Sequence, residues 1–215
     1  MKIGLSTSVI QRGRTGVAEY VFELVRALLP HAVHTFVLYV LEEDLPLFDF
    51  AKDFVELRPV SEECRPPIRD ILWHQTVLPR LAREHHLDVL HVPSYRRLLW
   101  PAPCGLVGTV HDLAAFHVAR KYDWRRMFYG RIVASRLAHR QDEIIAVSRN
   151  TARDMAAFWN LSGERVTTIH HGINQERFSA NVTPETQAAC RNRFGLHQPF
   201  FLYVARLEHP GKNHV

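Results

Sequence analysis

The chain has 215 residues, of which 47% are hydrophobic, and a formal net charge of +5 with histidine counted as neutral. This composition is typical of a globular protein and excludes a disordered chain, and the length suits one large domain with or without a short additional segment. The mild excess of positive charge is compatible with anionic partners such as phosphates or a membrane surface.

Cysteine usage bears on the cellular compartment. The three cysteines are far apart and form no CxxC pair, which argues against a disulfide framework and against a zinc site. A reducing, cytoplasmic compartment fits this usage best. We expect no signal peptide, because the opening run Met1–Ser6 is too short, and no stretch approaches the roughly 20 apolar residues of a membrane span.

Short runs rich in β-branched residues recur along the chain, and segments with helical periodicity separate many of them. The runs lie at Lys2–Val9, Thr35–Leu41, Phe54–Leu57, Asp88–Val92, Gly105–His111, Glu143–Val147 and Val166–His170. Alternation of this kind predicts an α/β fold, in which a doubly wound parallel sheet carries helices on both faces.

The helical segments differ in the clarity of their pattern. Gly16–Leu29 has a continuous apolar side that includes Val21, and it is predicted to be an amphipathic helix that packs on the sheet. Glu42–Lys52 fits either a short helix or a loop. Arg65–Glu84 fits a helix that Pro79 kinks or breaks.

The βα rhythm breaks in a polar stretch that contains a predicted helix at Pro184–Phe194. An apolar run at Phe200–Val204 follows and is predicted to be a strand. We expect residues 1–173 to form a first domain, residues 174–199 a link, and residues 200–215 the truncated start of a second domain, because one strand cannot bury a core.

Ligands of open parallel sheets bind beyond the carboxyl ends of the strands, so the segments that follow the strands are candidates for a site. Small, polar or imidazole residues follow several predicted strands, at Arg12–Gly16, His91–Tyr95, His111–Asp112, Ser148–Asn150 and His170–Asn174. We expect these segments to line one edge of a cleft. The residues predicted to lie on the acceptor side or in the cleft are Arg14, Thr15, Tyr95, Ser148, His171 and Asn174.

Gly13 and Gly16 stand in a turn before the first predicted helix. Such a turn lets backbone N–H groups approach a phosphate or sugar oxygen, and the helix dipole contributes about 0.3–1 kcal/mol toward an anion. An ordinary βα turn is the alternative. The segment matches neither GxGxxG nor GxxxxGK[ST], which excludes the dinucleotide fingerprint and the P-loop.

His111 and Asp112 directly follow a predicted strand. A histidine at this place can bind sugar hydroxyls or stabilise charge near a reacting centre, and the alternative is a structural residue that caps the strand. The pairs His85–His86 and His170–His171 match no metal-site spacing, so we expect no metal. Ser148 fits a helix N-cap better than a nucleophile, because GxSxG is absent.

The predicted helix Val118–Arg140 is strongly basic. On a helical wheel four arginines share an arc of about 100°, and they are Arg125, Arg126, Arg136 and Arg140. The predicted apolar side holds Trp124, Met127, Phe128, Ile132 and Ala138. The basic face is either solvated or contacts an anionic bilayer, at about 1 kcal/mol per basic residue. Nucleic acid is disfavoured, because no binding motif accompanies the charge.

Two further cations follow the apolar run at Phe200–Val204. Arg206 and Lys212 lie six residues apart in the segment after the predicted strand. A pair of cations so placed suits a diphosphate, since each charge-assisted hydrogen bond contributes about 1.5–3 kcal/mol. A basic turn without function is the alternative.

Together these segments resemble the family 4 glycosyltransferases, which have the GT-B fold. Phe201–Asn213 looks like the donor-phosphate motif of that family, and Gly13 and Gly16 match its glycine-rich first loop. Thr109–Asp112 matches its histidine segment. Ile145–Ser148 and Ile169–Asn174 match two further landmarks, so the resemblance runs along most of the chain.

The resemblance implies a retaining, metal-independent, hexosyltransferase-type transfer from a nucleotide sugar to an acceptor that is lipid-linked or a cell-envelope glycan, as in polysaccharide biosynthesis. No cofactor is implied. The N-terminal domain of the family is Rossmann-like and binds the acceptor, so this chain would carry the acceptor-side half. A cytoplasmic protein, peripheral on the inner face of the membrane, would suit the basic helix.

The resemblance also assigns roles to residues. Arg206 and Lys212, with the backbone of Gly13 and Gly16, would hold the donor phosphates. His111, with Asp112 beside it, would contact the donor sugar near the reacting carbon. The paired-glutamate motif of the family has no counterpart in these 215 residues.

Two other classes of function compete with this interpretation. The chain can be a non-catalytic domain that binds an acceptor or partner and needs a second chain for the donor site. A nicotinamide-dependent oxidoreductase is disfavoured, because the glycine fingerprint is missing.

Overall fold

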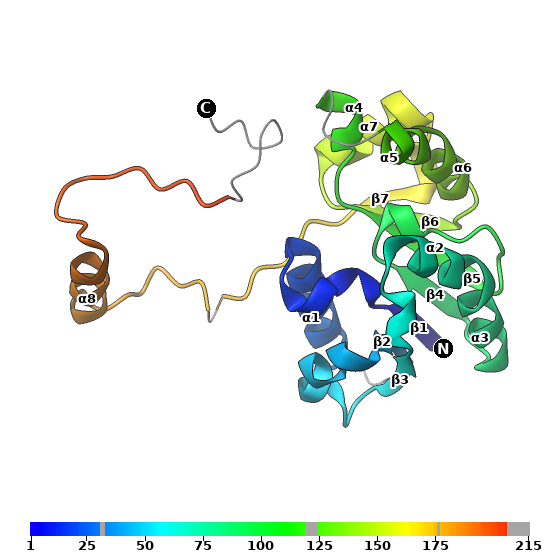
Figure 1. The fold of residues 1–215 in the computed structure, drawn as a ribbon, viewed down its shortest axis with the longest axis horizontal. Helices are drawn as coiled ribbons and strands as arrows, with labels where there is room; N and C mark the ends of the chain where they lie inside the picture. Colours follow the sequence, from blue (N-terminus) through cyan, green and yellow to red (C-terminus); the bar gives the residue numbers. More distant parts are fainter. Residues whose placement is uncertain (31–32, 119–123, 176, 206–215) are drawn as a thin grey trace. The chain divides into compact units, whose positions relative to one another are not determined.

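The computed structural model describes residues 1–30, 33–118, 124–175 and 177–205. The chain divides into two units, Met1–Gly172 and Ile173–Val215, and each is described by itself. The first unit holds a seven-stranded sheet with helices around it (Figure 1). Arg206 and Lys212 lie outside the described residues.

The sheet is parallel throughout, and its strand order is β3-β2-β1-β4-β5-β6-β7. The strands are β1 (Lys2–Ser6), β2 (Thr35–Leu41), β3 (Glu56–Val60), β4 (Val89–Val92), β5 (Gly105–Val110), β6 (Glu143–Ala146) and β7 (Val166–Thr168). Each of the seven strands predicted between residues 2 and 170 has a counterpart in this sheet, although the third begins and ends later than the predicted Phe54–Leu57. The first ends earlier than predicted, because the chain turns into a 3-10 helix at Ser8–Gly13.

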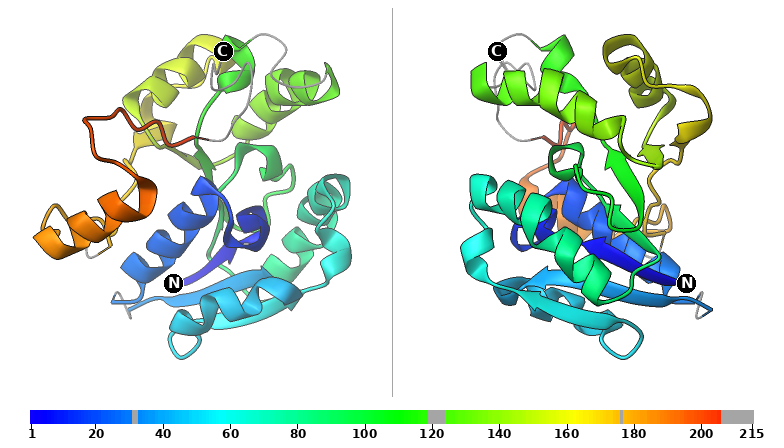
Figure 2. Two further views of the ribbon diagram at one scale, coloured as in Figure 1. Left: turned by 60° about the vertical axis from the view of Figure 1, so that its left-hand side comes forward. Right: turned by 90° about the vertical axis from the view of Figure 1, so that its right-hand side faces the viewer.

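Both faces of the sheet are buried, as predicted for a doubly wound fold. Successive side chains of a strand point to opposite faces. On one face Val37, Tyr39 and Leu41 of β2 pack in a cluster with Trp73 and Leu78. On the other face Phe36, Leu38 and Val40 pack with Val21 and Val25. Figure 2 gives two views of this layering.

The helices that cover the two faces follow the predicted segments closely. The first face is covered by α2 (Pro67–Thr76) and α3 (Leu78–Glu84), and the second by α1 (Gly16–Leu28). The break between α2 and α3 falls at Val77, because Pro79 can occupy only the first turn of a new helix. The uncertain segment forms a 3-10 helix at Glu42–Ala51.

A third cluster covers the β5 and β6 end of the first unit. It joins side chains of the two strands to α6 (Ala134–Ala138) and α7 (Arg149–Trp159). Two shorter helices, α4 (Ala114–His117) and α5 (Trp124–Phe128), precede α6 in the chain.

The predicted helix over residues 118–140 is not a continuous α-helix. A π-helical turn at Tyr129–Val133 separates α5 from α6, which changes the phase that the wheel assumed. The predicted apolar side is wrong for Trp124, Phe128 and Ile132, which are 73%, 54% and 38% exposed, and it is right for Ala138, which is buried. The inward side is made mainly of small residues that allow close packing, namely Gly130, Ala134 and Ala138, together with Leu137.

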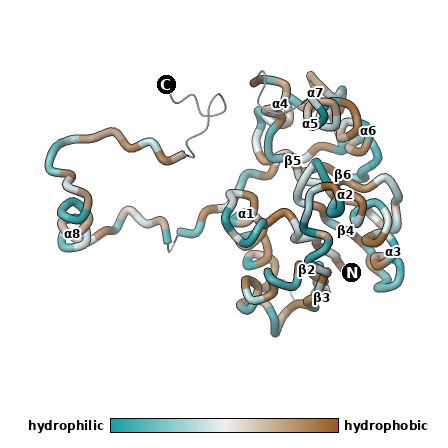
Figure 3. Tube along the Cα trace, in the orientation of Figure 1, coloured by the Kyte–Doolittle hydropathy of each residue, from teal (hydrophilic) through white to brown (hydrophobic). Residues whose placement is uncertain are grey.

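The second unit contains α8 (Pro184–Phe194), as predicted. The strand predicted at Phe200–Val204 is absent, and this segment has no regular structure. A strand forms only by pairing with another strand, and the structure describes none in residues 177–205. The run is hydrophobic (Figure 3), and Phe201 is fully exposed.

Among the described residues, no helix is both long enough and apolar enough to cross a bilayer.

Candidate functional site

The strand order reverses between β1 and β4, and β5 lies next to β4. From β1 the chain builds β2 and β3 on one side, and it then returns to place β4 on the other side of β1. In open α/β sheets the crevice at such a switch point is where ligands bind. The segments that follow these strands are the first loop, Thr7–Thr15, the turn Pro93–Arg97, and His111–Asp112.

The first loop contains a run of left-handed backbone that the sequence did not predict. Gln11, Arg12 and Gly13 have φ values of 47°, 58° and 73°. Left-handed backbone costs roughly 1–2 kcal/mol for each residue with a Cβ, so Gln11 and Arg12 are strained. Arg12 Nε and Nη2 donate to Oε2 of Glu43 at 3.0 and 2.7 Å, which fixes the loop. Backbone strain of this kind, in residues other than glycine, is found most often at ligand sites.

The two glycines of this loop serve different needs. Gly13 has positive φ, which favours glycine. Gly16 is the first residue of α1, and a Cβ placed on it would meet nothing within 4 Å. Thr15 Oγ1 accepts a hydrogen bond from the Ala18 N–H at 3.1 Å and caps α1, and Arg14 is exposed beside it.

His111 is held at the end of β5 by two polar contacts. Its Nε2 lies 3.2 Å from the carbonyl oxygen of Pro93, and its own carbonyl accepts from Oγ1 of Thr151 at 3.2 Å. Because a carbonyl only accepts, Nε2 carries the proton and Nδ1 is left as an acceptor. Burial lowers the pKa of His111, and nearby His171 lowers it further, although the Pro93 bond acts the other way. The neutral imidazole with an acceptor Nδ1 therefore dominates at neutral pH.

Three rings from separate parts of the chain meet at His111. The Tyr20 ring of α1 stands edge-on to it, with centroids 5.0 Å apart. The His171 ring lies 5.2 Å from His111 and 4.8 Å from Tyr20. Burial also lowers the pKa of His171. The structure thus brings together the predicted residues His111 and His171, and it adds Tyr20.

Tyr20 was missed in the sequence, although one signal could have found it. It lies on the sheet-facing side of the first helix, one turn after the glycine loop, where an apolar residue is expected. Its hydroxyl lies 3.2 Å from Oγ1 of Thr109, and that oxygen lies 2.8 Å from Nε2 of His91. This polar chain connects the ring cluster to the buried side of β4.

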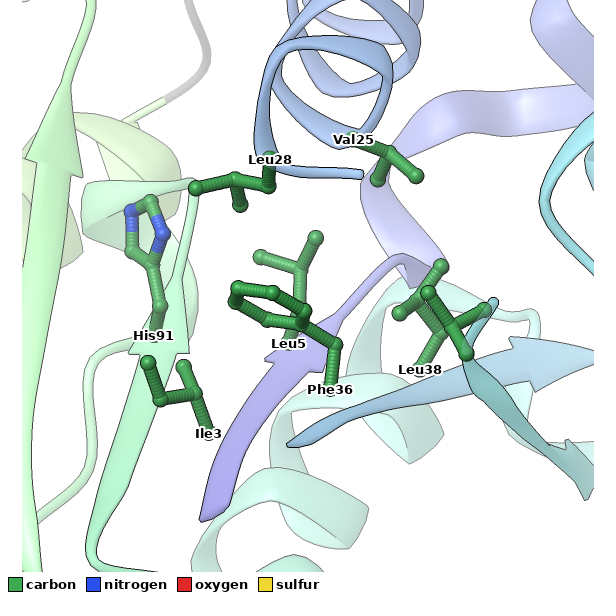
Figure 4. A pocket seen from close by; sticks show the side chains of 8 residues that line it. Ile3, Leu5, Val25, Leu28, Phe36, Leu38 and His91 are labelled. Carbon is green, nitrogen blue, oxygen red and sulfur yellow. The ribbon is translucent and has the colours of Figure 1, made fainter. Parts of the chain in front are cut away.

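His91 lies between this polar chain and an apolar cavity beneath α1 (Figure 4). The cavity has a volume of about 20 Å³, and it is lined by Ile3, Leu5, Val25, Leu28, Phe36, Leu38, Val55 and His91. Burial lowers the pKa of His91 to about 4, and His111 adds to the lowering. His91 is therefore neutral at physiological pH.

A second buried polar network ties the end of β1 to α2 and to the turn after β4. Ser6 Oγ lies 2.8 Å from Nε2 of His74, and Nδ1 of His74 faces the carbonyl oxygen of Asp70 at 2.7 Å and its Oδ1 at 3.1 Å. Arg97 Nε donates to Oδ2 of Asp70 at 2.6 Å. Burial alone would raise the pKa of Asp70, but the hydrogen bond to His74 and the guanidinium of Arg97 lower it.

This network has the residue types of a Ser-His-Asp catalytic triad, yet its burial excludes that role. Ser6 is 1% exposed and His74 is 0% exposed, so no substrate reaches the serine hydroxyl. Its place in the fold gives it a structural role, because it anchors the strand that leads into the strained first loop.

Two predicted residues serve as local caps. Asp112 Oδ1 accepts a hydrogen bond from the Ala114 N–H at 2.9 Å, which starts α4. Ser148 Oγ accepts from the Thr151 N–H at 3.0 Å and caps α7, as the absence of a nucleophile motif indicated. Asp112 stays exposed next to His111, where it favours the protonated imidazole.

The remaining predicted residues fall in other parts of the chain. Tyr95 does not line a cleft, because it is buried in the core, edge-on to Trp159 at 5.7 Å. Asn174 belongs to the second unit, where its side chain accepts from the Arg177 N–H at 2.9 Å. Arg206 and Lys212 fall in the part that the structure does not describe.

The predicted basic face is only partly a feature of one helix. Arg125 and Arg136 are exposed on α5 and α6. Arg140 follows α6, and its guanidinium lies over the Trp100 ring at 3.7 Å. The side chain of Arg126 lies outside the described part of the chain. The exposed surface around these arginines also carries aromatic side chains.

Among the residues that the structure describes, no group of at least three histidine, cysteine, aspartate or glutamate side chains is placed to hold a metal ion.

The doubly wound parallel sheet and its switch-point loops define a class of α/β proteins that bind ligands at the carboxyl edge of the sheet. A more specific assignment comes from comparison with known families. The model of Glycosyltransferase Family 4 matches residues 14–177, which is most of the chain. The chain therefore belongs to this family. A search of curated proteins finds no significant match.

Solved structures share the fold at low sequence identity. A glycosyltransferase from Rickettsia africae ESF-5 has 17% identity and a TM-score of 0.50, over 92% of this chain and 50% of that one. UGT89C1 from Arabidopsis thaliana, complexed with UDP-L-rhamnose, has 9% identity and a TM-score of 0.53, over 91% of this chain and 62% of that one. The chain thus spans about half to three-fifths of the length of these proteins.

Proposed function

We propose that the protein is a glycosyltransferase that moves a sugar from a nucleotide-sugar donor to an acceptor, and that this chain carries the acceptor-side half. The family match over residues 14–177 carries the proposal, because it includes both His111 and His171. The complex of UGT89C1 with UDP-L-rhamnose supports a nucleotide sugar as donor, since that protein has the same fold.

The chemistry of the described residues supports sugar recognition. The neutral His111 presents Nδ1 as an acceptor for a sugar hydroxyl at the carboxyl edge of the sheet. The left-handed first loop and the N-terminus of α1 present backbone N–H groups, which suit a phosphate oxygen near Gly13 and Gly16.

We further propose that the transfer retains the anomeric configuration and needs no metal or other cofactor. The leaving diphosphate then requires cations from the protein, and Arg206 and Lys212 are the residues we assign to this task. Two such cations neutralise a diphosphate through charge-assisted hydrogen bonds.

A transfer assay tests this function. The complete gene product is incubated with radiolabelled UDP-, GDP- and ADP-sugars and a lipid and glycan extract, with and without EDTA. The proposal predicts transfer from at least one donor, undiminished by EDTA, with a retained anomeric configuration in the NMR spectrum of the product. Acceptor binding without transfer from any donor would instead identify a non-catalytic binding domain.

We also propose that the acceptor is a lipid-linked or cell-envelope glycan, used in polysaccharide biosynthesis by a cytoplasmic enzyme that docks on an anionic membrane. Support comes from the exposed surface of α5 and α6. It combines Arg125 and Arg136 with the exposed aromatic rings of Trp124 and Phe128. Arginines and aromatic rings together suit the headgroup region of a bilayer.

Liposome binding tests the membrane contact. Replacement of Arg125, Arg136 and Arg140 by Gln removes three charges and is predicted to weaken binding to phosphatidylglycerol vesicles by roughly two orders of magnitude. The matched control replaces Arg69, Arg80 and Arg83, which are exposed on α2 and α3. Equal loss in the two variants would mean that only net charge matters, and no loss would leave the basic face solvated.

A further inference from the structure

The direction of the hydrogen bonds in the polar chain from Tyr20 to His91 depends on one tautomer. Thr109 Oγ1 lies 3.2 Å from the Tyr20 hydroxyl and 2.8 Å from Nε2 of His91. A threonine hydroxyl has one proton and can accept two hydrogen bonds. Whether the Tyr20 proton is used within this chain therefore depends on the tautomer of His91.

The surroundings of His91 select one tautomer. Its Nε2 faces Thr109, and Figure 4 shows the ring beside Leu28 and Phe36, with a nitrogen turned toward these apolar side chains. That nitrogen is Nδ1. A proton on Nδ1 would face these apolar side chains, which contain no hydrogen-bond acceptor, whereas an unprotonated nitrogen is tolerated better there.

The lining of the cavity also disfavours a water molecule that would accept a hydrogen bond from a protonated Nδ1. The cavity of about 20 Å³ could contain one molecule by volume, but His91 is the single polar side chain among its lining residues. A buried water needs two to four polar partners. This environment therefore favours the tautomer in which Nε2 of His91 carries the proton and donates it to Thr109.

The Thr109 proton is then free to be donated to the Tyr20 oxygen. In that arrangement the Tyr20 proton is left for a partner outside the chain, because each hydroxyl has a single proton. The Tyr20 ring stands edge-on to His111 at 5.0 Å and lies 4.8 Å from His171, so the side chain that carries this proton belongs to the ring cluster.

We propose that Tyr20 is a ligand-binding residue, whose hydroxyl donates a hydrogen bond to a hydroxyl oxygen of the sugar that His111 contacts. This inference rests on the proposed function. A sugar hydroxyl both donates and accepts, and Nδ1 of His111 and the Tyr20 O–H supply one acceptor and one donor. Burial raises the pKa of Tyr20, so the phenol stays protonated and able to donate.

The first test measures the tautomer of His91 in the 215-residue chain by 15N-edited NMR of the imidazole rings at pH 7. The inference predicts a protonated Nε2. A protonated Nδ1 overturns it, because the hydrogen bonds of the chain then run the other way and consume the Tyr20 proton.

The second test compares the ligand affinities of the complete gene product with those of its Tyr20→Phe variant. The probes are UDP-glucose, UDP-galactose, UDP-N-acetylglucosamine, GDP-mannose and ADP-glucose, with UDP, GDP and ADP as sugar-free references, and binding is followed on the His111 imidazole signals. Tyr20→Phe is predicted to weaken the best nucleotide sugar about five- to tenfold and to leave its sugar-free reference unchanged. Tyr39→Phe is the matched control, because it removes a phenol hydroxyl that bonds His85 away from the ring cluster.

The possible outcomes distinguish a failure of the role proposed for Tyr20 from a failure of the proposed function. Equal affinity of Tyr20→Phe and the complete gene product for the nucleotide sugar overturns the role of Tyr20 and leaves the proposed function standing. Equal weakening of the sugar-free reference also overturns it, since the contact would then be to the nucleotide. If no probe shifts the His111 signals of the complete gene product, the proposed function fails and the role of Tyr20 fails with it.

Discussion

The buried His91 makes stability depend on pH in a way that one substitution can isolate. Its pKa is about 4 in the folded chain and 6.5 without the protein environment. A lowered histidine pKa means that the unfolded chain binds the proton first, so stability is fully present above pH 6.5 and is lost as the pH falls toward 4. Two and a half pKa units correspond to roughly 3 kcal/mol.

The perturbation is His91→Gln, which keeps an N–H donor for Thr109 and cannot titrate. Urea unfolding, followed by tryptophan fluorescence between pH 7 and pH 4, gives the free energy of unfolding of both proteins. The stability advantage of the unchanged chain over the variant should shrink by roughly 3 kcal/mol across this range. Groups that titrate equally in both proteins cancel in the difference.

A matched control separates this effect from general weakening. Leu106→Ala opens a buried position of β5 and removes no titratable group, so it should lower stability by about 2–5 kcal/mol at every pH. If His91→Gln also shows a constant difference from pH 7 to pH 4, then His91 is not held neutral by burial, and the account of the polar chain is refuted.

Further predictions concern the buried network and the first loop. Arg97→Met should lower the free energy of unfolding, measured with urea, by roughly 3–5 kcal/mol, because Asp70 then keeps a buried charge without its partner. The double variant with Asp70→Asn should recover part of this loss, because the buried charge is removed as well. Gly13→Ala should cost about 1–2 kcal/mol, because its φ is +73°. Gly16→Ala should fold at least as stably as the unchanged chain, so any loss of nucleotide-sugar affinity in it reports close approach of a ligand to the backbone.

The sequence predicted the sheet well, because β-branched runs and the alternation of elements are local signals. The amphipathic α1 and the break near Pro79 were predicted for the same reason. The left-handed backbone at Gln11–Gly13 was not predicted, because it depends on tertiary contacts such as the one between Arg12 and Glu43. The helical wheel over residues 118–140 predicted the wrong buried side, because close packing there selects small residues over large apolar ones.

The candidate site shows the same division. Strand ends identified His111 and His171, because parallel strands place their carboxyl ends at one edge. Tyr95 follows β4 in the same way, yet it is buried in the core. No local pattern reveals the contacts of Tyr20, which join α1 to β5 across the fold. The strand predicted at Phe200–Val204 is absent, because hydrophobicity alone supplies no strand partner.

The central claim is that His111 serves sugar transfer rather than folding. The most direct measurement is the rate of transfer from the best labelled nucleotide sugar by the complete gene product and by its His111→Ala variant, with urea unfolding of both. The account predicts a fall in kcat of roughly 10- to 100-fold with little loss of stability. Unchanged transfer, or a large loss of stability that accounts for the lower rate, would contradict it and leave His111 as a structural cap of β5.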